Sequence, residues 1–116
     1  MKKERTERER LQDILDAIQL IWDHSVADDD EYHRDEVKRW FFLKQIEIMG
    51  EAAWKVGEET RRIYPEIPWK KIAGIRHRLV HDYWEVDWDL LLQILKTELS
   101  PLYRDITGVI QDADSC

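Results

Sequence analysis

Hydrophobic residues recur every three or four positions along most of the chain, which is the spacing of an amphipathic helix. The first stripe predicts a helix over residues 6–26 and consists of Leu11, Ile14, Leu15, Ile18, Ile21 and Trp22. The second predicts the longest helix, over residues 33–63, and consists of Phe42, Ile46, Met49, Ala53 and Val56. Between the stripes, the acidic run from Asp28 to Glu31 is self-repelling and predicts a solvated loop.

Prolines and helix-capping residues divide the second half of the chain. Pro65 and Pro68 exclude a continuous helix at this point, and Pro68 suits the first turn of a third helix. The inner face of that helix is predicted to hold Ile72, Ile75, Leu79 and Tyr83. Asp87 is a predicted N-cap, and the helix after it should bury Leu91, Ile94 and Leu95. Ser100 and Pro101 predict the start of a short fifth helix with Leu102, Ile106 and Val109 inside.

Strand-like alternation of apolar and polar residues is not sustained anywhere in the sequence, so we expect an all-α protein. The chain has 116 residues, enough for one modest core. Short connections favour antiparallel packing of consecutive helices. We therefore predict a single domain over residues 1–116, a four- to five-helix antiparallel bundle with frayed ends at residues 1–5 and 112–116.

Composition narrows the class of protein further. Hydrophobic residues make up 43% and charged residues 37%, which excludes a disordered tail and a disulfide scaffold. The only cysteine is Cys116, so no disulfide can form within the chain. No apolar run approaches the roughly 18–20 residues that cross a bilayer, and no signal-peptide core follows the charged start. We expect a soluble, cytoplasmic protein that contacts no membrane.

The formal net charge of −7 excludes nucleic-acid binding through the overall field of the protein. One stretch departs from this acidity, because residues 61–81 hold a single acid, Glu66, and two of the four histidines, His77 and His81. The basic residues there are Arg61, Arg62, Lys70, Lys71, Arg76 and Arg78. A phosphate-bearing ligand would be attracted to this stretch rather than to the rest of the surface.

Arginine and histidine together can cleave RNA without a metal ion. Histidine can move the proton of the 2′-hydroxyl or of the leaving oxygen, while arginine stabilises charge on the phosphorane. On one straight helix, however, Arg76 and His81 would differ by about 140° in direction. Either the helix is distorted near His81, or the site combines residues from two copies of the chain. We favour a twofold dimer.

The residues Arg76, His77, His81 and Tyr83 resemble the motif of the HEPN superfamily of ribonucleases, specifically HepT-like toxins. That motif is Arg, four to six residues, His, any residue and Tyr. The segments similar to other family signatures are Ile48 to Ala53, Tyr64 to Trp69, Ile72 to Gly74, and Val86 to Asp87. The resemblance covers about residues 35–110.

This resemblance implies a metal-independent endoribonuclease toxin that cleaves tRNA or mRNA, leaves a cyclic phosphate and requires no cofactor. It also implies a homodimer whose motif helices face a shared cleft. Arg76 and His81 would be the catalytic pair, with His77 and Arg78 as auxiliary residues. The implied partner is an MntA-like nucleotidyltransferase antitoxin of a type VII system, which would silence the toxin by AMPylation of Tyr83.

Several residues allow a second interpretation. His77, His81 and Glu85 lie at four-residue steps and could hold zinc, but no fourth ligand is evident and we expect no metal. Tyr83 could pack its ring in the core with the hydroxyl at the edge. Most of the six tryptophans should serve the core or an interface. The candidates for RNA contact are Lys70, Lys71, Trp84 and Trp88.

The alternative function is a non-catalytic binding module, or scaffold, for a minimal nucleotidyltransferase. It would use the same helical surface and would need no chemistry from this chain. The two hypotheses differ in whether His81 is required for RNA cleavage or only for complex formation. DNA is not an expected partner under either of them.

Overall fold

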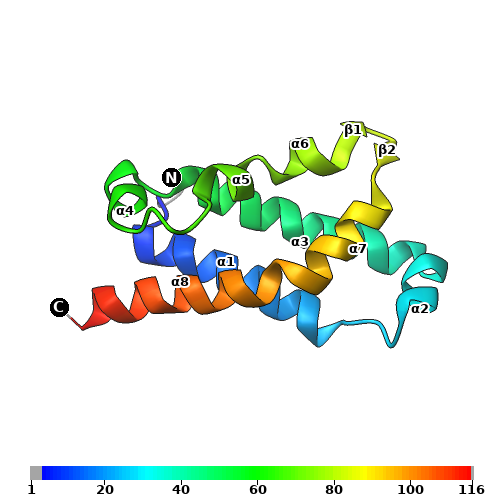
Figure 1. The fold of residues 1–116 in the computed structure, drawn as a ribbon, viewed down its shortest axis with the longest axis horizontal. Coiled ribbons are helices and arrows are strands. Elements are labelled where there is room, and N and C mark those ends of the chain that lie inside the picture. Colours follow the sequence, from blue (N-terminus) through cyan, green and yellow to red (C-terminus); the bar gives the residue numbers. More distant parts are fainter. Residues whose placement is uncertain (1–3, 116) are drawn as a thin grey trace.

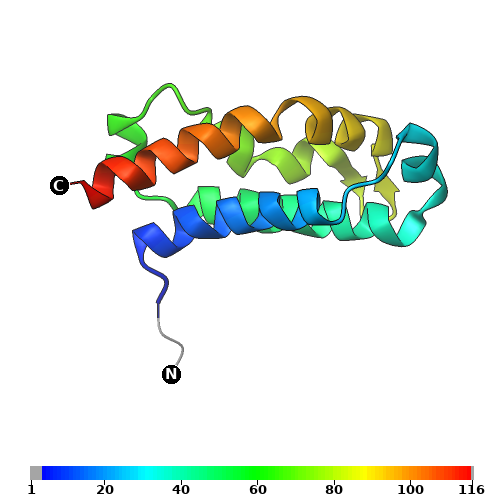
Figure 2. The same ribbon diagram turned by 90° about the horizontal axis from the view of Figure 1, so that it is seen from below.

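Two antiparallel helices, α1 (Glu7–Asp23) and α3 (Glu36–Lys55), pack along their lengths in this computed structural model, which describes residues 4–115. Helix α8 (Leu99–Asp114) runs along α1 on another side (Figures 1 and 2). The other elements are α2 (Asp29–Arg34), α4 (Glu58–Ile63), α5 (Trp69–Ala73), α6 (Ile75–Leu79), β1 (Val80–Asp82), β2 (Glu85–Val86) and α7 (Trp88–Thr97). The mostly helical antiparallel bundle confirms the predicted fold class.

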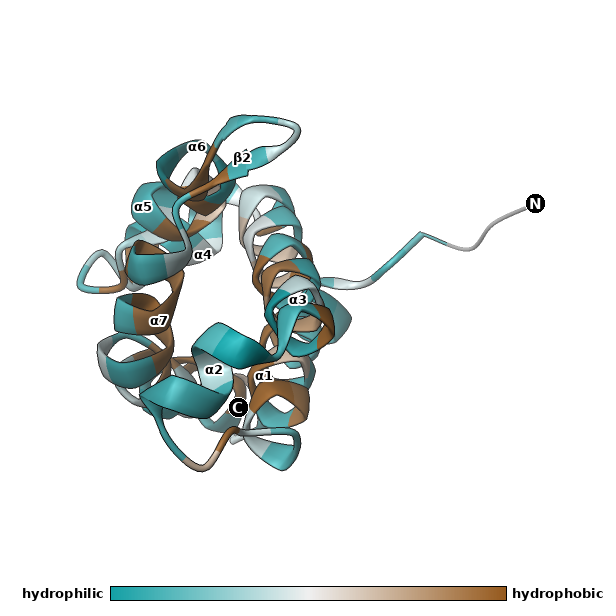
Figure 3. Cartoon of the chain, turned by 90° about the vertical axis from the view of Figure 1, so that its right-hand side faces the viewer, coloured by the Kyte–Doolittle hydropathy of each residue, from teal (hydrophilic) through white to brown (hydrophobic). Residues whose placement is uncertain are grey.

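The core lies between α1, α3 and the α7–α8 pair, and the apolar sides of the helices face it (Figure 3). Its largest fully buried side chains are Tyr32, Phe42, Ile14, Ile18, Ile46, Met49, Leu79, Leu91, Ile94, Leu99 and Ile106. Both predicted stripes supply this core, although Trp22 at the end of the first is only half-buried. The hydrophobic periodicity therefore identified the inner faces of α1 and α3 correctly.

The acidic run was predicted to be a loop, but it forms the start of a helix. Asp28 is the N-cap of α2, and its Oδ1 accepts a hydrogen bond of 2.8 Å from the backbone N–H of Glu31. Carboxylates in a first helical turn interact favourably with the exposed N–H groups there. This interaction outweighs the mutual repulsion on which the loop prediction rested.

The predicted helix over residues 33–63 is interrupted, because α3 ends at Lys55 and α4 begins at Glu58. The side chain of Glu7, on α1, accepts hydrogen bonds from the N–H of Gly57 and from the hydroxyl of Thr60. Arg61 donates hydrogen bonds to backbone carbonyl oxygens near the end of α3. The break is thus stabilised by side chains that satisfy the backbone groups it exposes.

The third predicted helix is also shorter than its apolar stripe suggested. It divides at Gly74 into α5 and α6 and ends at Leu79, after which β1 and β2 form a small antiparallel hairpin. Val80 pairs with Val86, and the backbone N–H of Asp87 donates to the carbonyl oxygen of Leu79 at 2.8 Å. The prediction that Tyr83 continues the helical stripe is wrong, because this residue lies in the turn of the hairpin.

The last two helices begin close to their predicted starts. Asp87 caps α7 as predicted, its Oδ1 accepting a hydrogen bond of 3.0 Å from the N–H of Leu90. Helix α8 begins at Leu99 after Glu98, one residue before the predicted cap at Ser100. Residues 112–114, for which we expected fraying, end this helix, while Cys116 and residues 1–3 lie outside the described residues. None of the described helices is long and apolar enough to cross a membrane.

Candidate active site

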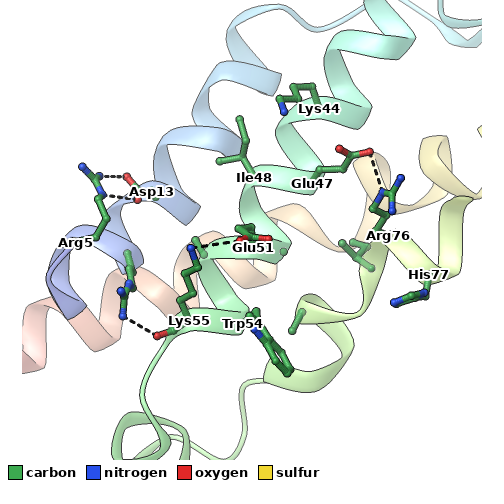
Figure 4. Close-up of a pocket in the computed structure, with 15 residues that line it drawn as sticks. Arg5, Asp13, Lys44, Glu47, Ile48, Glu51, Trp54, Lys55, Arg76 and His77 are labelled. Carbon is green, nitrogen blue, oxygen red and sulfur yellow. Dashed lines mark hydrogen bonds and ion pairs between the residues drawn. The ribbon is translucent and has the colours of Figure 1, made fainter. Parts of the chain in front are cut away.

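Arg76 lies on α6 with 62% of its side chain exposed, and its Nε is 3.6 Å from Oε1 of Glu47 on α3 (Figure 4). The pair borders a pocket of about 540 Å³ between α6, the outer face of α3 and the start of α1. Charged residues around it include Arg5, Asp13, Lys44, Glu47, Glu51, Lys55 and Arg76. The pocket is accessible and mixed in charge, with Arg76 at one end.

Gly50 allows α6 to lie this close to α3. A Cβ atom at this position would be 3.0 Å from Cγ2 of Ile75 and 3.1 Å from the carbonyl oxygen of Ile72. Ile72 and Ile75 are themselves buried, so they anchor α5 and α6 in the core. This packing fixes the backbone that carries Arg76.

His77 follows Arg76 and is exposed next to the same pocket. His77 also lines a second pocket, together with residues from the end of α3 and from α4 and α5. Among the residues that the structure describes, neither His77 nor His81 has a side-chain hydrogen bond or ion pair. Both imidazoles are therefore available to a ligand.

His81 lies on β1, beyond the end of α6, and is exposed. It is absent from the described residues that line the Arg76 pocket. One chain thus brings Arg76 and His77 together at the pocket and places His81 on the adjoining hairpin. The helix ends before His81, which is the distortion that the first of our two alternatives named, but His81 does not line the Arg76 pocket of the same chain. The twofold dimer remains a prediction.

Tyr83 is 79% exposed, which excludes the alternative that its ring packs in the core. Its ring centroid is 4.6 Å from that of Trp84, and the two planes lie 85° apart. The backbone N–H of Tyr83 donates a hydrogen bond of 2.8 Å to Oδ1 of Asp82, which stabilises the turn. The hairpin thus presents the phenol to solvent.

The other residues predicted from the basic stretch have different surroundings. Arg78 forms two hydrogen bonds with Glu98, of 3.2 and 3.0 Å, at the junction of α7 and α8. These bonds lower the pKa of the Glu98 carboxyl group. Lys71 lies 3.8 Å from the same carboxylate. The structure therefore places Arg78 and Lys71 in a partly exposed ion-pair cluster around Glu98, and Lys70 in the second pocket with His77.

The two tryptophans expected to contact RNA also differ. Trp84 is 64% exposed on the hairpin. Trp88 is half-buried, its ring lying 4.9 Å from that of Trp40 and 5.4 Å from the guanidinium carbon of Arg39. Packing between α7 and α3 accounts for Trp88, whereas Trp84 stays accessible.

The structure separates the residues considered for a metal triad. His77 is on α6, His81 on β1 and Glu85 on β2, so the three do not share the face of one helix. Within residues 4–115, no group of three histidine, cysteine, aspartate or glutamate side chains is placed to hold a metal ion. The four-residue spacing of His77, His81 and Glu85 therefore does not bring them together as metal ligands.

Comparison with known proteins shows that residues 14–109 match the family model described as Ribonuclease HepT-like. The chain belongs to the HepT-like ribonuclease family. This HepT-like chain is 31% identical over 100 residues to a Thermococcus cleftensis protein named "Probable ribonuclease HepT", covering 84% of this chain and 90% of that protein. No solved structure matches significantly.

Two proteins of Methanocaldococcus jannaschii are also similar to this HepT-like ribonuclease. The one named "Putative RNase MJ1380" is 28% identical over 97 residues, which cover 83% of this chain and 89% of that protein. "Putative RNase MJ0125" is 29% identical over 105 residues, which cover 90% of each chain.

Two residues that line the candidate site were not singled out by the sequence analysis, Glu47 beside Arg76 and Trp54 between the two pockets. Both lie on the outer face of α3, together with Lys44, Ile48, Glu51 and Lys55. Their helical spacing was visible in the sequence. The sequence did not show that α6 lies opposite this face of α3.

Proposed function

We propose that this chain is a metal-independent endoribonuclease that acts as the toxin of a type VII toxin–antitoxin pair, with Arg76 and His81 as its catalytic residues. The observation that carries the proposal is the accessibility of the motif in a HepT-like chain: Arg76 borders an open pocket, and His81 follows on an exposed hairpin. Neither side chain is enclosed in the core, so RNA can reach both.

In the proposed reaction, the ribose 2′-oxygen attacks the adjacent phosphorus and the bond from phosphorus to the 5′-oxygen breaks. The products are a 2′,3′-cyclic phosphate and a free 5′-hydroxyl group. Arg76 stabilises the negative charge that develops on the phosphorane. His81 removes the 2′-hydroxyl proton or protonates the leaving oxygen. Those two roles need two groups, and His77 or a second copy of the chain in a homodimer provides the other one.

Silencing by an MntA-like nucleotidyltransferase is the second part of the proposal. The phenol oxygen of Tyr83 would attack the α-phosphorus of ATP, releasing pyrophosphate and leaving AMP on the tyrosine. The 79% exposure of Tyr83 meets the main requirement, which is access for another enzyme. A phosphodiester two residues from His81 would repel the RNA backbone electrostatically.

The function is tested by incubating purified protein with tRNA and total RNA in EDTA, using wild type and His81→Ala. Intact mass first establishes that Tyr83 is unmodified, and light scattering establishes the oligomeric state. We expect the wild type to cleave RNA and His81→Ala to leave it intact. Intact RNA with unmodified dimeric wild type would refute the proposal. If His81→Ala failed only to bind the nucleotidyltransferase, the non-catalytic alternative would be supported.

The silencing step needs a separate measurement. After co-expression with a nucleotidyltransferase encoded beside this chain, the intact mass should rise by AMP units in wild type and not in Tyr83→Phe. The Tyr103→Phe variant is the matched control, because its hydroxyl lies on α8 away from the hairpin. An unmodified Tyr83 beside an active partner would contradict this part of the proposal.

A further inference from the structure

A pocket of about 410 Å³ lies next to the Arg76 pocket, between the end of α3 and helices α4, α5 and α6. The residues around it are Trp54, Arg61, Lys70, Ala73, Gly74 and His77. This lining combines an aromatic side chain with three basic ones and, among the described residues, includes no carboxylate. The Arg76 pocket, by comparison, includes Asp13, Glu47 and Glu51.

The positive charge of Arg61 is held rigidly in this second pocket. Its Nε donates to the carbonyl oxygen of Val56 at 3.1 Å, and its Nη2 donates to those of Ala53 and Trp54 at 2.8 and 2.7 Å. These acceptors are neutral, and no carboxylate in residues 4–115 forms an ion pair with Arg61. The guanidinium offsets the negative end of the α3 dipole and leaves a fixed net positive charge beside the pocket, in a protein whose net charge is −7.

Trp54 connects the two pockets. Its indole is 67% exposed at the last turn of α3, and it borders both cavities, as does His77. Figure 4 shows both rings extending away from their helices beside the Arg76 pocket. An exposed indole without a core contact is available as a flat stacking surface.

We propose that this second pocket binds one unpaired nucleotide of the RNA strand, next to the linkage that Arg76 and His81 cleave. The base stacks on Trp54, and its phosphate lies near Lys70 in the field of Arg61. This inference rests on the proposed ribonuclease function and adds a substrate class to it. The enzyme therefore prefers a single-stranded segment, because a base in a duplex must first be unpaired and unstacked before it can reach the indole.

The composition of the pocket favours RNA over a protein partner. Protein interfaces are enriched in aromatic residues and arginine but depleted in lysine, whereas sites for single-stranded nucleic acid combine aromatic platforms with basic side chains of both kinds. Here Trp54 is next to Lys70, Arg61 and His77, with no acidic side chain among the described lining residues. The alternative, that Trp54 anchors a second copy of the chain, is one outcome of the test.

The test measures binding separately from cleavage, using a fluorescent single-stranded 2′-O-methyl oligoribonucleotide that cannot form a cyclic phosphate. We expect Trp54→Ala to weaken binding by about 5- to 150-fold, the range of lost base stacking, and Trp54→Phe to restore most of it. Trp40→Ala is the matched control, since that tryptophan lies on the same helix, is 42% exposed and does not line the pocket. The melting temperature of Trp54→Ala should stay near wild type.

The phosphate contact is tested with Lys70→Gln against Arg104→Gln. Both variants remove one exposed positive charge, but Arg104 lies on α8, outside the pocket. When the logarithm of the affinity for the oligonucleotide is plotted against the logarithm of the salt concentration, the slope gives the number of counterions released on binding. Only Lys70→Gln should reduce this number, by about one. Equal effects of the two variants would overturn the assignment of the phosphate to this pocket.

The remaining outcomes separate this proposal from the ribonuclease proposal. Wild type that binds the oligonucleotide through Trp54 but cleaves no RNA would refute the enzyme and leave the nucleotide site standing. If the wild type cleaves RNA and Trp54→Ala binds the oligonucleotide as tightly as the wild type, the nucleotide site is refuted and the enzyme is not. The site is also refuted if Trp54→Ala no longer dimerises, or if the wild type cleaves RNA but does not bind the oligonucleotide. AMP is the second probe. If the wild type binds AMP as tightly as it binds the oligonucleotide, the pocket is a site for a free nucleotide and the proposal that it binds RNA is refuted.

Discussion

The carboxylate of Glu47 lies 3.6 Å from Nε of Arg76, so an acid on α3 accompanies the basic residue proposed to contact phosphate. The pair is partly exposed, and such pairs contribute about 0.2–1 kcal/mol. RNA must compete with this carboxylate for the guanidinium. We therefore expect Glu47→Gln to tighten binding of uncleavable RNA by about two- to five-fold at low salt, an effect that salt should reduce.

The control for this prediction is Glu51→Gln, one helical turn further along α3. Glu51 borders the same pocket, but it lies 3.4 Å from Lys55 instead of contacting Arg76. Anisotropy titrations at two salt concentrations compare the variants. Weaker binding by Glu47→Gln would indicate that Glu47 orients Arg76 and does not merely compete with phosphate.

Gly50→Ala should destabilise the fold, because the added Cβ meets Ile75 Cγ2 at 3.0 Å and a backbone oxygen of Ile72 at 3.1 Å. Overpacking of this kind costs about 1–3 kcal/mol of unfolding free energy. The matched substitution is Gly108→Ala on α8, where no atom lies within 4 Å of the new Cβ. That variant should be stabilised by up to about 1 kcal/mol. Urea unfolding of both variants checks the prediction, and equal stabilities would contradict it.

The Arg78–Glu98 pair should make stability depend on pH. Because Arg78 lowers the pKa of Glu98 below its ordinary value of 4.5, the charged carboxylate stabilises the folded state above that pH. This stabilisation is lost as the pH falls through the lowered pKa. Wild type should therefore exceed Glu98→Gln in unfolding free energy at pH 7, and the difference should shrink toward pH 3.

Urea titrations at pH 7, 4.5 and 3 measure that difference, with Asp105→Asn as the control. Asp105 forms an exposed pair with its neighbour Arg104 at 3.6 Å. A constant gap between wild type and Glu98→Gln across this pH range would show that the carboxylate acts through shape or hydrogen bonding and not through its charge.

Hydrophobic periodicity was sufficient to predict the parts of the fold that burial determines. The stripes on α1 and α3 are long, and their inner residues form the core. Elements that depend on local or distant polar contacts were not predictable in this way. The break before α4 relies on Glu7, 50 residues from Gly57, and the β1–β2 hairpin is too short to show alternation.

The candidate site also has features that the sequence predicted and features that it did not. Motif spacing identified Arg76, His77, His81 and Tyr83, and the structure places all four on the surface. The motif spacing did not reveal that Arg78 pairs with Glu98 or that Glu47 pairs with Arg76, because those contacts depend on which helices pack together. Sequence also overestimated the availability of Trp88, whose ring packs beside Trp40.

The most direct test of the catalytic assignment is the single-turnover rate at which unmodified protein cleaves an end-labelled RNA in EDTA. We expect wild type to produce fragments ending in a cyclic phosphate, and Arg76→Ala to cleave about 10²- to 10³-fold more slowly while remaining folded. Cleavage by Arg76→Ala at the wild-type rate, or uncut RNA after incubation with wild type, would contradict the account.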